Sequence, residues 1–185
     1  MSAIEAELDQ DWVENTDKAV DPEQFLTFIM NDEEYGVDIL IVKEIKIWES
    51  ATSIPRSPAH VRGVINLRGT IVPIIDLRQC FGMPAIEYGP LTVILVLQVS
   101  SEKGDREIGI VVDEVSDVHT LEAGQLSPNP EIGSGSKIQC IRGLVSVGEK
   151  MVILLDMDEL LTQDDFSGIS EVKEALLGAT NDSNT

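Results

Sequence analysis

The chain has 185 residues, of which 43% are apolar and only 4% aromatic, and its net charge at pH 7 is −20. This composition is typical of a globular protein with an aliphatic core, in one domain or two small ones. The negative charge argues against nucleic acid or anionic lipid as a partner, and apolar runs of about seven residues are far shorter than the roughly 20 that span a bilayer.

The acidic charge is concentrated at the two ends of the chain. Residues 1–24 contain eight acidic residues against Lys18, and residues 156–185 contain eight against Lys173. We therefore expect an acidic disordered leader over 1–24 and an acidic tail over 162–185, with a short helical pattern near its middle. The N-terminus lacks the basic and then apolar pattern of an export signal, which predicts a cytoplasmic protein.

The first half of the chain predicts short strands joined by turns. Residues 25–30 form a strand, and a returning strand begins at Tyr35. Asp38 is a candidate cap for a short helix over 39–45, but this β-branched run also suits a strand, so both readings remain open. A loop with two prolines follows at 53–58.

A hairpin is the most informative feature of this half. Two apolar runs within 61–78 flank the sequence Asn66-Leu67-Arg68-Gly69. Asn suits the first position of a type I turn and Gly the fourth, which predicts that Leu67 and Arg68 lie at the tip in solvent. An arginine beside an apolar residue is typical of an interface anchor. Asp76 then predicts the N-cap of a short helix.

The second half repeats this pattern. A linker at 87–90 leads to a β-rich run over 91–99, and alternating patterns at 108–112 and 115–121 predict two more strands. Residues 124–136 form an irregular excursion with several Gly and Pro residues. A hairpin over 141–155 and a short helix from Asp156 close this half.

The two hairpins align without a gap at an offset of 80 residues. Arg62 and Gly63 correspond to Arg142 and Gly143, whereas Arg68 at the first tip corresponds to Gly148. A weaker match, at an offset of 73, aligns 36–45 with 109–118. Many short strands, repeated twice, predict two small antiparallel barrels packed through an aliphatic face, the first over about 25–88 and the second over about 91–161.

The residues predict no catalytic or metal chemistry. His60 and His119 have no Cys, His or acidic residue at the spacing of metal ligands. Cys80 and Cys140 lack a CxxC context or a neighbouring base, which is typical of reduced thiols in the core of a cytosolic protein. We therefore expect no enzymatic activity, no metal and no cofactor.

Four stretches together closely resemble the CheW family of chemotaxis adaptors: DEEYGVDIL (32–40), VKEI (42–45), RGVINLRGTIVPIIDLR (62–78) and GIVVDEVSDV (109–118). The resemblance covers about 25–161. It implies two SH3-like five-stranded antiparallel barrels with a few short helices, with terminal segments that cross between them. It also implies a non-enzymatic role in signal transduction, in which the protein couples the cytoplasmic tips of chemoreceptors to the regulatory domain of the histidine kinase CheA, recruited to membrane-associated receptor arrays but not inserted in the membrane.

Carried over by motif, the resemblance predicts partner contacts around Val42, Glu44, Gly63, Arg68 and Val118, with Gly143 of the second hairpin as a weaker match. Leu67 is a further candidate because of its predicted place at the hairpin tip. From spacing alone, Glu44 is either a solvated charge or a contact, and the two glycines suit backbone geometry or close packing. Two alternatives stay open, the same adaptor role in a non-flagellar chemosensory pathway and a small-ligand-binding β-barrel.

Overall fold

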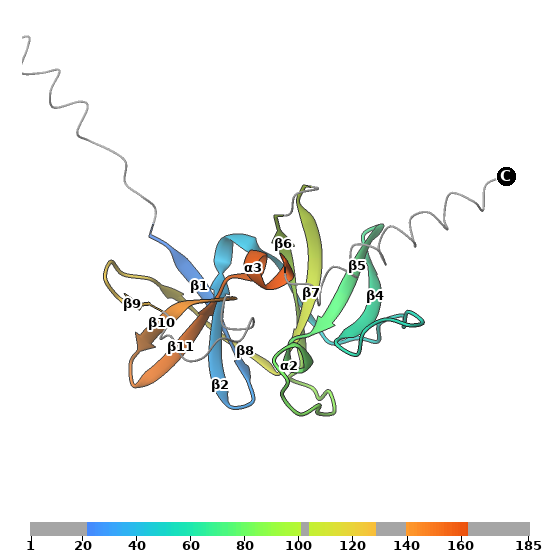
Figure 1. The fold of residues 1–185 in the computed structure, drawn as a ribbon, viewed down its shortest axis with the longest axis horizontal. Coiled ribbons are helices and arrows are strands. Elements are labelled where there is room, and N and C mark those ends of the chain that lie inside the picture. The colour runs from blue at the N-terminus through green and yellow to red at the C-terminus, as the bar shows by residue number, and fades with distance from the viewer. Residues whose placement is uncertain (1–21, 101–103, 129–139, 163–185) are drawn as a thin grey trace, which may run out of the picture.

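In a computed structural model of the chain, residues 22–100, 104–128 and 140–162 are described. They form two β-sheets that lie side by side (Figure 1). The six-stranded sheet contains, in spatial order, β8 (Glu114–Thr120), β1 (Gln24–Met30), β2 (Glu33–Asp38), β11 (Lys150–Leu155), β10 (Ile141–Val147) and β9 (Leu126–Ser127). The five-stranded sheet contains β3 (Val42–Ile47), β6 (Val93–Val99), β7 (Arg106–Val112), β5 (Thr70–Asp76) and β4 (Val61–Leu67). The prediction of a mainly β fold is confirmed.

Each sheet is closed into a small barrel by a segment that follows one of its edge strands in the chain and pairs with the other end of the sheet. In the five-stranded sheet, Thr52, which comes after β3, pairs with Val64 of β4 at the opposite end of the strand order. In the six-stranded sheet, β9 comes after β8 and pairs with β10 in the same way, Ser127 lying opposite Leu144. We call the two units the five-stranded barrel and the six-stranded barrel.

The strands are not divided between the barrels at residue 90, where the repeat placed the boundary. The β1–β2 hairpin comes from the first copy but lies in the six-stranded barrel, and β6 and β7 come from the second copy but lie in the five-stranded barrel. The exchange creates one parallel pair in each sheet, β5 with β7 and β2 with β11, so the expected antiparallel pairing holds only for the other pairs of strands. Each copy thus completes the barrel of the other.

The repeat determines the register of the hairpins. Both hairpins have a bulge at the same position and the same partners on either side of it. The equivalent pairs are Val61 with Ile75 and Gly63 with Ile74 in the first hairpin, and Ile141 with Leu155 and Gly143 with Leu154 in the second. The weaker match is also structural, because Gly36 faces Leu154 across the parallel pair as Gly109 faces Ile74.

Three apolar clusters fill the described structure. The largest lies between the barrels and includes Phe28 and Met30 of β1 together with Leu95 and Leu97 of β6, all fully buried. Burying side chains of this size stabilises the fold by about 1.5–3 kcal/mol each. Two smaller clusters lie within the barrels: Ile65, Val72, Ile74, Ile94, Val96 and Val111 in the five-stranded barrel, and Phe25, Val145, Val152 and Leu154 in the six-stranded one.

The helices are short. The ambiguous run after Asp38 divides into the 3-10 helix η1 (Ile39–Ile41), whose Leu40 amide donates to Asp38, and then β3. The helix α2 (Leu77–Cys80) follows its predicted cap, and α3 (Met157–Thr162) follows β11. Within the described ranges no helix is long and apolar enough to cross a membrane. The expected disordered leader, up to residue 21, and the tail from 163 lie outside these ranges.

Candidate partner-binding surface

The turn of the β4–β5 hairpin differs by one residue from its prediction. Leu67 pairs with Thr70, so the two central residues are Arg68, with φ 51°, and Gly69, with φ 86°. Positive φ at both positions is the pattern of a type I′ turn, whose twist matches that of the flanking strands. The expectation that Leu67 lies at the tip is therefore wrong: it ends β4 and packs, partly buried, on the core of the five-stranded barrel.

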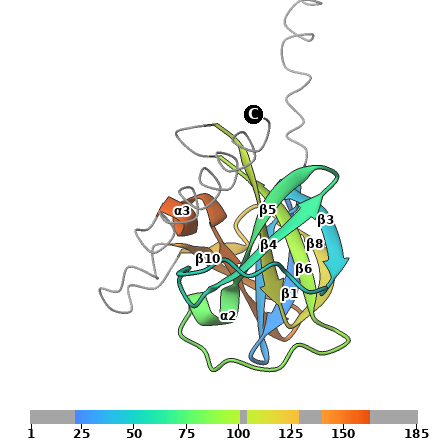
Figure 2. The ribbon, with the colours of Figure 1, turned by 90° about the vertical axis from the view of Figure 1, so that its right-hand side faces the viewer.

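Arg68 remains at the tip, and it reaches across the barrel to β3. Its Nη2 lies 3.4 Å from Oε2 of Glu44, and the two side chains are 81% and 27% exposed. The hairpin and β3 are at opposite ends of the strand order, but barrel closure brings them to one side of the molecule (Figure 2). An ion pair this exposed contributes at most about 1 kcal/mol to stability. It therefore leaves both charges available to a partner.

The strand β3 presents a free edge and two exposed apolar side chains. Among the described residues it pairs only with β6, and Ile45 and Ile47 are 48% and 73% exposed. Val42, Glu44 and Lys46 point to the opposite, half-buried face. Sequence reasoning missed the two isoleucines, because both faces of β3 mix apolar and charged residues and the alternation does not tell which face is buried.

Val118 lies on the other barrel, in the strand that corresponds to β3. At the repeat offset of 73 residues Val118 matches Ile45, and β8 is an edge strand like β3. Val118 is 43% exposed. The two barrels thus each present one apolar residue at the equivalent position of an edge strand, and the structure does not bring Val118 into the Glu44 and Arg68 surface.

Gly63 and Gly143 are required by the backbone. A Cβ atom on Gly63, whose φ is 137°, would lie 2.2 Å from the carbonyl oxygen of Thr52, and one on Gly143 would lie 2.5 Å from that of Ser127. These oxygens belong to the segments that close the two barrels. A larger residue at either glycine would therefore disturb barrel closure.

Six Lys and Arg residues within 43–78 form a basic island in this acidic sequence, but the fold does not gather them into a single surface. Arg78 is buried, with Nη1 2.6 Å from Oδ2 of Asp113, and Arg62 lies over the ring of Tyr88 at 5.2 Å from its centroid. Lys46 pairs with Glu49 at 3.0 Å. Arg68 is thus the residue of this island that the fold places at a hairpin tip beside an edge strand.

The described residues contain no group of three or more His, Cys, Asp or Glu side chains that could hold a metal ion. The interiors of both barrels are filled by the aliphatic clusters described above. Around Glu44 and Arg68 the chain presents apolar side chains, an exposed ion pair and a free strand edge.

Comparisons with known proteins agree with these features. The family model of the CheW-like domain matches residues 24–165. The chain is 42% identical over 153 residues to chemotaxis protein CheW of Klebsiella aerogenes, with 83% of this chain and 90% of that protein covered. It is 37% identical over 142 residues to that of Rhizobium meliloti, covering 77% and 89%.

Among solved structures, the chain is similar to scaffolding protein TtCheW from Thermoanaerobacter tengcongensis. The TM-score is 0.69 at 28% sequence identity, and the match covers 78% of this chain and 90% of that one. Family model, sequence relatives and fold thus point to one assignment. The chain belongs to the CheW family, whose members are scaffold or adaptor proteins of chemotaxis signal transduction and not enzymes.

Proposed function

We propose that this protein works in the cytoplasm, where it couples the cytoplasmic tips of chemoreceptors to the regulatory domain of the histidine kinase CheA and is recruited to receptor arrays. We further propose that the surface around Val42, Glu44 and Arg68 is one of its contact sites. The observation that carries this proposal is the exposed ion pair between Glu44 and Arg68, beside the apolar edge of β3.

The backbone at Arg68 supports a role for its side chain. A left-handed φ of 51° costs a non-glycine residue about 1–2 kcal/mol, and the equivalent residue of the second hairpin is Gly148, with φ 61°. An arginine at this position therefore lowers the stability of the turn. A contact made by the guanidinium gives a physical reason for its presence.

The two edge strands support an adaptor with two separate contacts. β3 and β8 occupy equivalent places in the two barrels but differ in sequence, with Ile45 on one and Val118 on the other. Leu67, Gly63 and Gly143 shape the barrels that present these strands. Because the strands belong to different barrels, one partner can occupy β3 while another occupies β8.

The test is a titration of variants against the kinase regulatory domain and a receptor cytoplasmic fragment, separately and together. A central arginine anchor contributes about 2 kcal/mol or more, a roughly 30-fold change in affinity, so we expect Arg68→Ala to weaken ternary assembly by at least about tenfold. Glu44→Lys should do the same. If the two charges act as a pair, the double variant Glu44→Ala, Arg68→Ala is less damaging than the sum of the single variants.

Arg56 provides a matched control. It is also an exposed arginine with a left-handed φ, of 63°, but lies in the loop before β4. Arg56→Ala should keep the affinity of the wild type. If Arg68→Ala is folded, as judged by circular dichroism, and binds both partners with wild-type affinity, the proposed contact site is wrong.

A further inference from the structure

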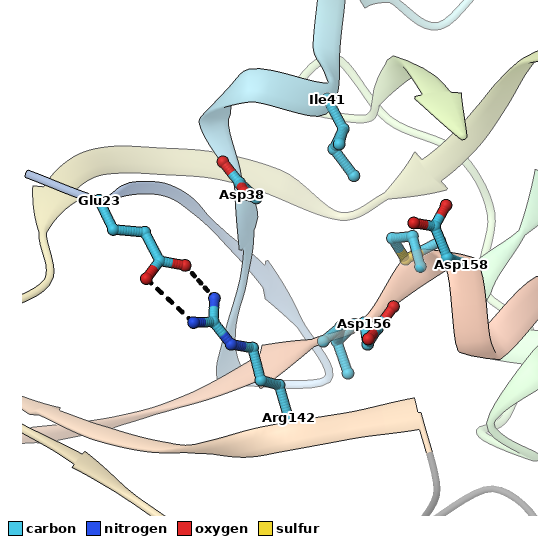
Figure 3. Close-up of a pocket in the computed structure, with 8 residues that line it drawn as sticks. Glu23, Asp38, Ile41, Arg142, Asp156 and Asp158 are labelled. Atoms are coloured by element: carbon cyan, nitrogen blue, oxygen red, sulfur yellow. Dashed lines mark hydrogen bonds and ion pairs between the residues drawn. The ribbon is translucent and has the colours of Figure 1, made fainter. Parts of the chain in front are cut away.

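A cavity in the six-stranded barrel corresponds to a site that is filled in the five-stranded barrel. Its volume is about 350 Å³, and its polar lining consists of Glu23, Asp38, Arg142, Asp156 and Asp158 (Figure 3). Ile41, Leu155 and Met157 supply apolar wall. The cavity lies where the ends of β2, β10 and β11 meet the start of α3.

The filled site holds a tyrosine of the same chain. The hydroxyl of Tyr88 donates a hydrogen bond to Oδ2 of Asp76, 2.6 Å away, and the guanidinium of Arg62 lies over the Tyr88 ring. Burial and this hydrogen bond both raise the pKa of Tyr88, so the phenol stays protonated as the donor. Asp76 and Arg62 thus hold a hydrogen-bond donor that comes from outside the hairpin.

Arg142 and Asp156 are the counterparts of Arg62 and Asp76. The offset is 80 residues in both cases, and the surrounding backbone pairs identically. The Asp76 amide donates to the His60 carbonyl at 2.7 Å, as the Asp156 amide does to the Cys140 carbonyl at 2.7 Å. The cavity is therefore the same place in the repeat, with no tyrosine of the described residues in it.

The two sites differ in charge. At the filled site Arg62 and Asp76 balance, and the bound side chain is neutral. In the cavity Glu23 engages the Arg142 guanidinium through both oxygens, with Oε2 2.9 Å from Nη2, which lowers the pKa of Glu23 and raises that of Arg142. With Arg142 neutralised, Asp38, Asp156 and Asp158 leave an excess of negative charge.

Each of these three carboxylates retains an oxygen for an incoming donor. Their hydrogen bonds within the described structure all use Oδ1, which accepts from the backbone amides of Leu40, Glu159 and Ser100. Among the described residues, Oδ2 of each makes no hydrogen bond and can accept one. A guanidinium carries five N–H donors in a fixed plane, which suits several carboxylate oxygens better than a single ammonium does.

We propose that this cavity binds a basic side chain, arginine above all, of a protein partner. In the five-stranded barrel this position of the repeat holds the Tyr88 hydroxyl, a hydrogen-bond donor from outside the hairpin. In the cavity the excess negative charge favours a cationic donor over a neutral one. The aliphatic stem of the incoming residue packs on Ile41 and Met157. The site lies in the other barrel from Glu44 and Arg68 and does not depend on which proteins the chain couples.

The test is a titration of the isotope-labelled full-length chain with L-argininamide, followed by NMR, with N-acetyl-L-tyrosinamide in parallel. We expect saturable shifts of the backbone amides of Ile41, Arg142 and Asp158 with argininamide and smaller ones with the phenol. Asp156→Asn with Asp158→Asn keeps the Oδ1 acceptors but removes two charges. It should weaken binding at least about fivefold, the change expected for losing a charge-assisted hydrogen bond.

A second acidic cavity, lined by Asp32, Glu33, Glu34 and Lys150, supplies the matched control. The double variant Asp32→Asn, Glu33→Gln removes the same charge there and should leave argininamide binding unchanged. Equal loss in both double variants would show a general effect of net charge and overturn the proposal. Absence of saturable shifts at the cavity, or binding of the phenol without argininamide, would overturn it as well.

Discussion

Arg78 and Asp113 form a largely buried ion pair that connects the two barrels. The Arg78 side chain is 6% exposed, and its Nη1 lies 2.6 Å from Oδ2 of Asp113, whose side chain is 21% exposed. Asp113 lies in the crossing from β7 to β8, and the same Oδ2 accepts from the amide of Asn31 in the β1–β2 turn. The Arg78 Nε donates to the carbonyl of Pro84. One guanidinium thus joins elements of both barrels.

Arg78→Ala should therefore be strongly destabilising, because it leaves Asp113 without its cation. Removing one partner of a buried pair costs about 3–5 kcal/mol, and the partial exposure of Asp113 favours the lower end, about 3 kcal/mol. Urea denaturation measures this free energy of unfolding. Glu49→Ala, which breaks the pair with Lys46 from its 57% exposed side, should change it by no more than about 0.5 kcal/mol. Similar losses in the two variants would mean that the buried pair does not hold the barrels together.

The glycines at the parallel pairs are predicted to tolerate no side chain without repacking. A Cβ atom on Gly109 would lie 2.5 Å from Cδ1 of Ile74 and 2.9 Å from Cγ2 of Ile94. Gly109→Ala should therefore destabilise by about 1–3 kcal/mol, the usual cost of overpacking. Ile74→Val removes the Cδ1 atom and should recover part of this loss when combined with Gly109→Ala.

Gly89→Ala is the control for this prediction, since nothing lies within 4 Å of its Cβ position. Its free energy of unfolding should stay close to that of the wild type. Additive losses from Gly109→Ala and Ile74→Val would contradict the prediction, because the rescue depends on one contact between the two residues.

Most of the structural features that could be predicted from the sequence were predicted from the repeat. It anticipated the paired hairpins and the cap at Asp76, because these features depend on local turn and register patterns, whereas the bulge that the two hairpins share was not predicted. The exchange of the β1–β2 hairpin was implied only by the family resemblance, and the boundary drawn from the repeat missed it. The alternation of apolar and polar residues, together with turn residues, predicts that a strand forms. Which strand pairs with it depends on packing between segments that are far apart in the sequence.

The candidate site was also predicted only in part, because local patterns place a turn but not the residues that pack beside it. Arg68 was placed at a tip because any short turn between the two apolar runs puts it there, although the type I′ register moved Leu67 to the end of β4, where it packs partly buried on the core. Arg78 counted toward the basic island, since a sequence does not show that Asp113 lies beside it. Ile45 and Ile47 were missed because both faces of β3 contain apolar and charged residues, so the sequence does not show which face is buried.

The turn at Arg68 gives a prediction that separates stability from function. Both Arg68→Gly and Arg68→Ala lose the ion pair with Glu44, but only Arg68→Gly relieves the left-handed strain of the backbone. We expect Arg68→Gly to be more stable than Arg68→Ala by about 1 kcal/mol, measured by urea denaturation. Both variants lack the guanidinium and should weaken partner binding equally. A binding defect that follows stability instead would contradict the contact role of this side chain.

The stability of the chain should fall at alkaline pH in a way that depends on Tyr88. Burial, and then the hydrogen bond to Asp76, raise the pKa of Tyr88 in the folded state. A raised folded pKa means that its stabilising effect is complete below the pKa of the unfolded phenol, about 10, and is lost as the pH rises above it. Tyr88→Phe lacks this titration and should lose less stability than the wild type between about pH 9 and 11. Tyr35, whose pKa burial also raises, titrates in both proteins, so the difference between their melting temperatures isolates Tyr88. Parallel curves for the two proteins across this range would show that burial and the hydrogen bond to Asp76 do not raise the pKa of Tyr88 in the folded state.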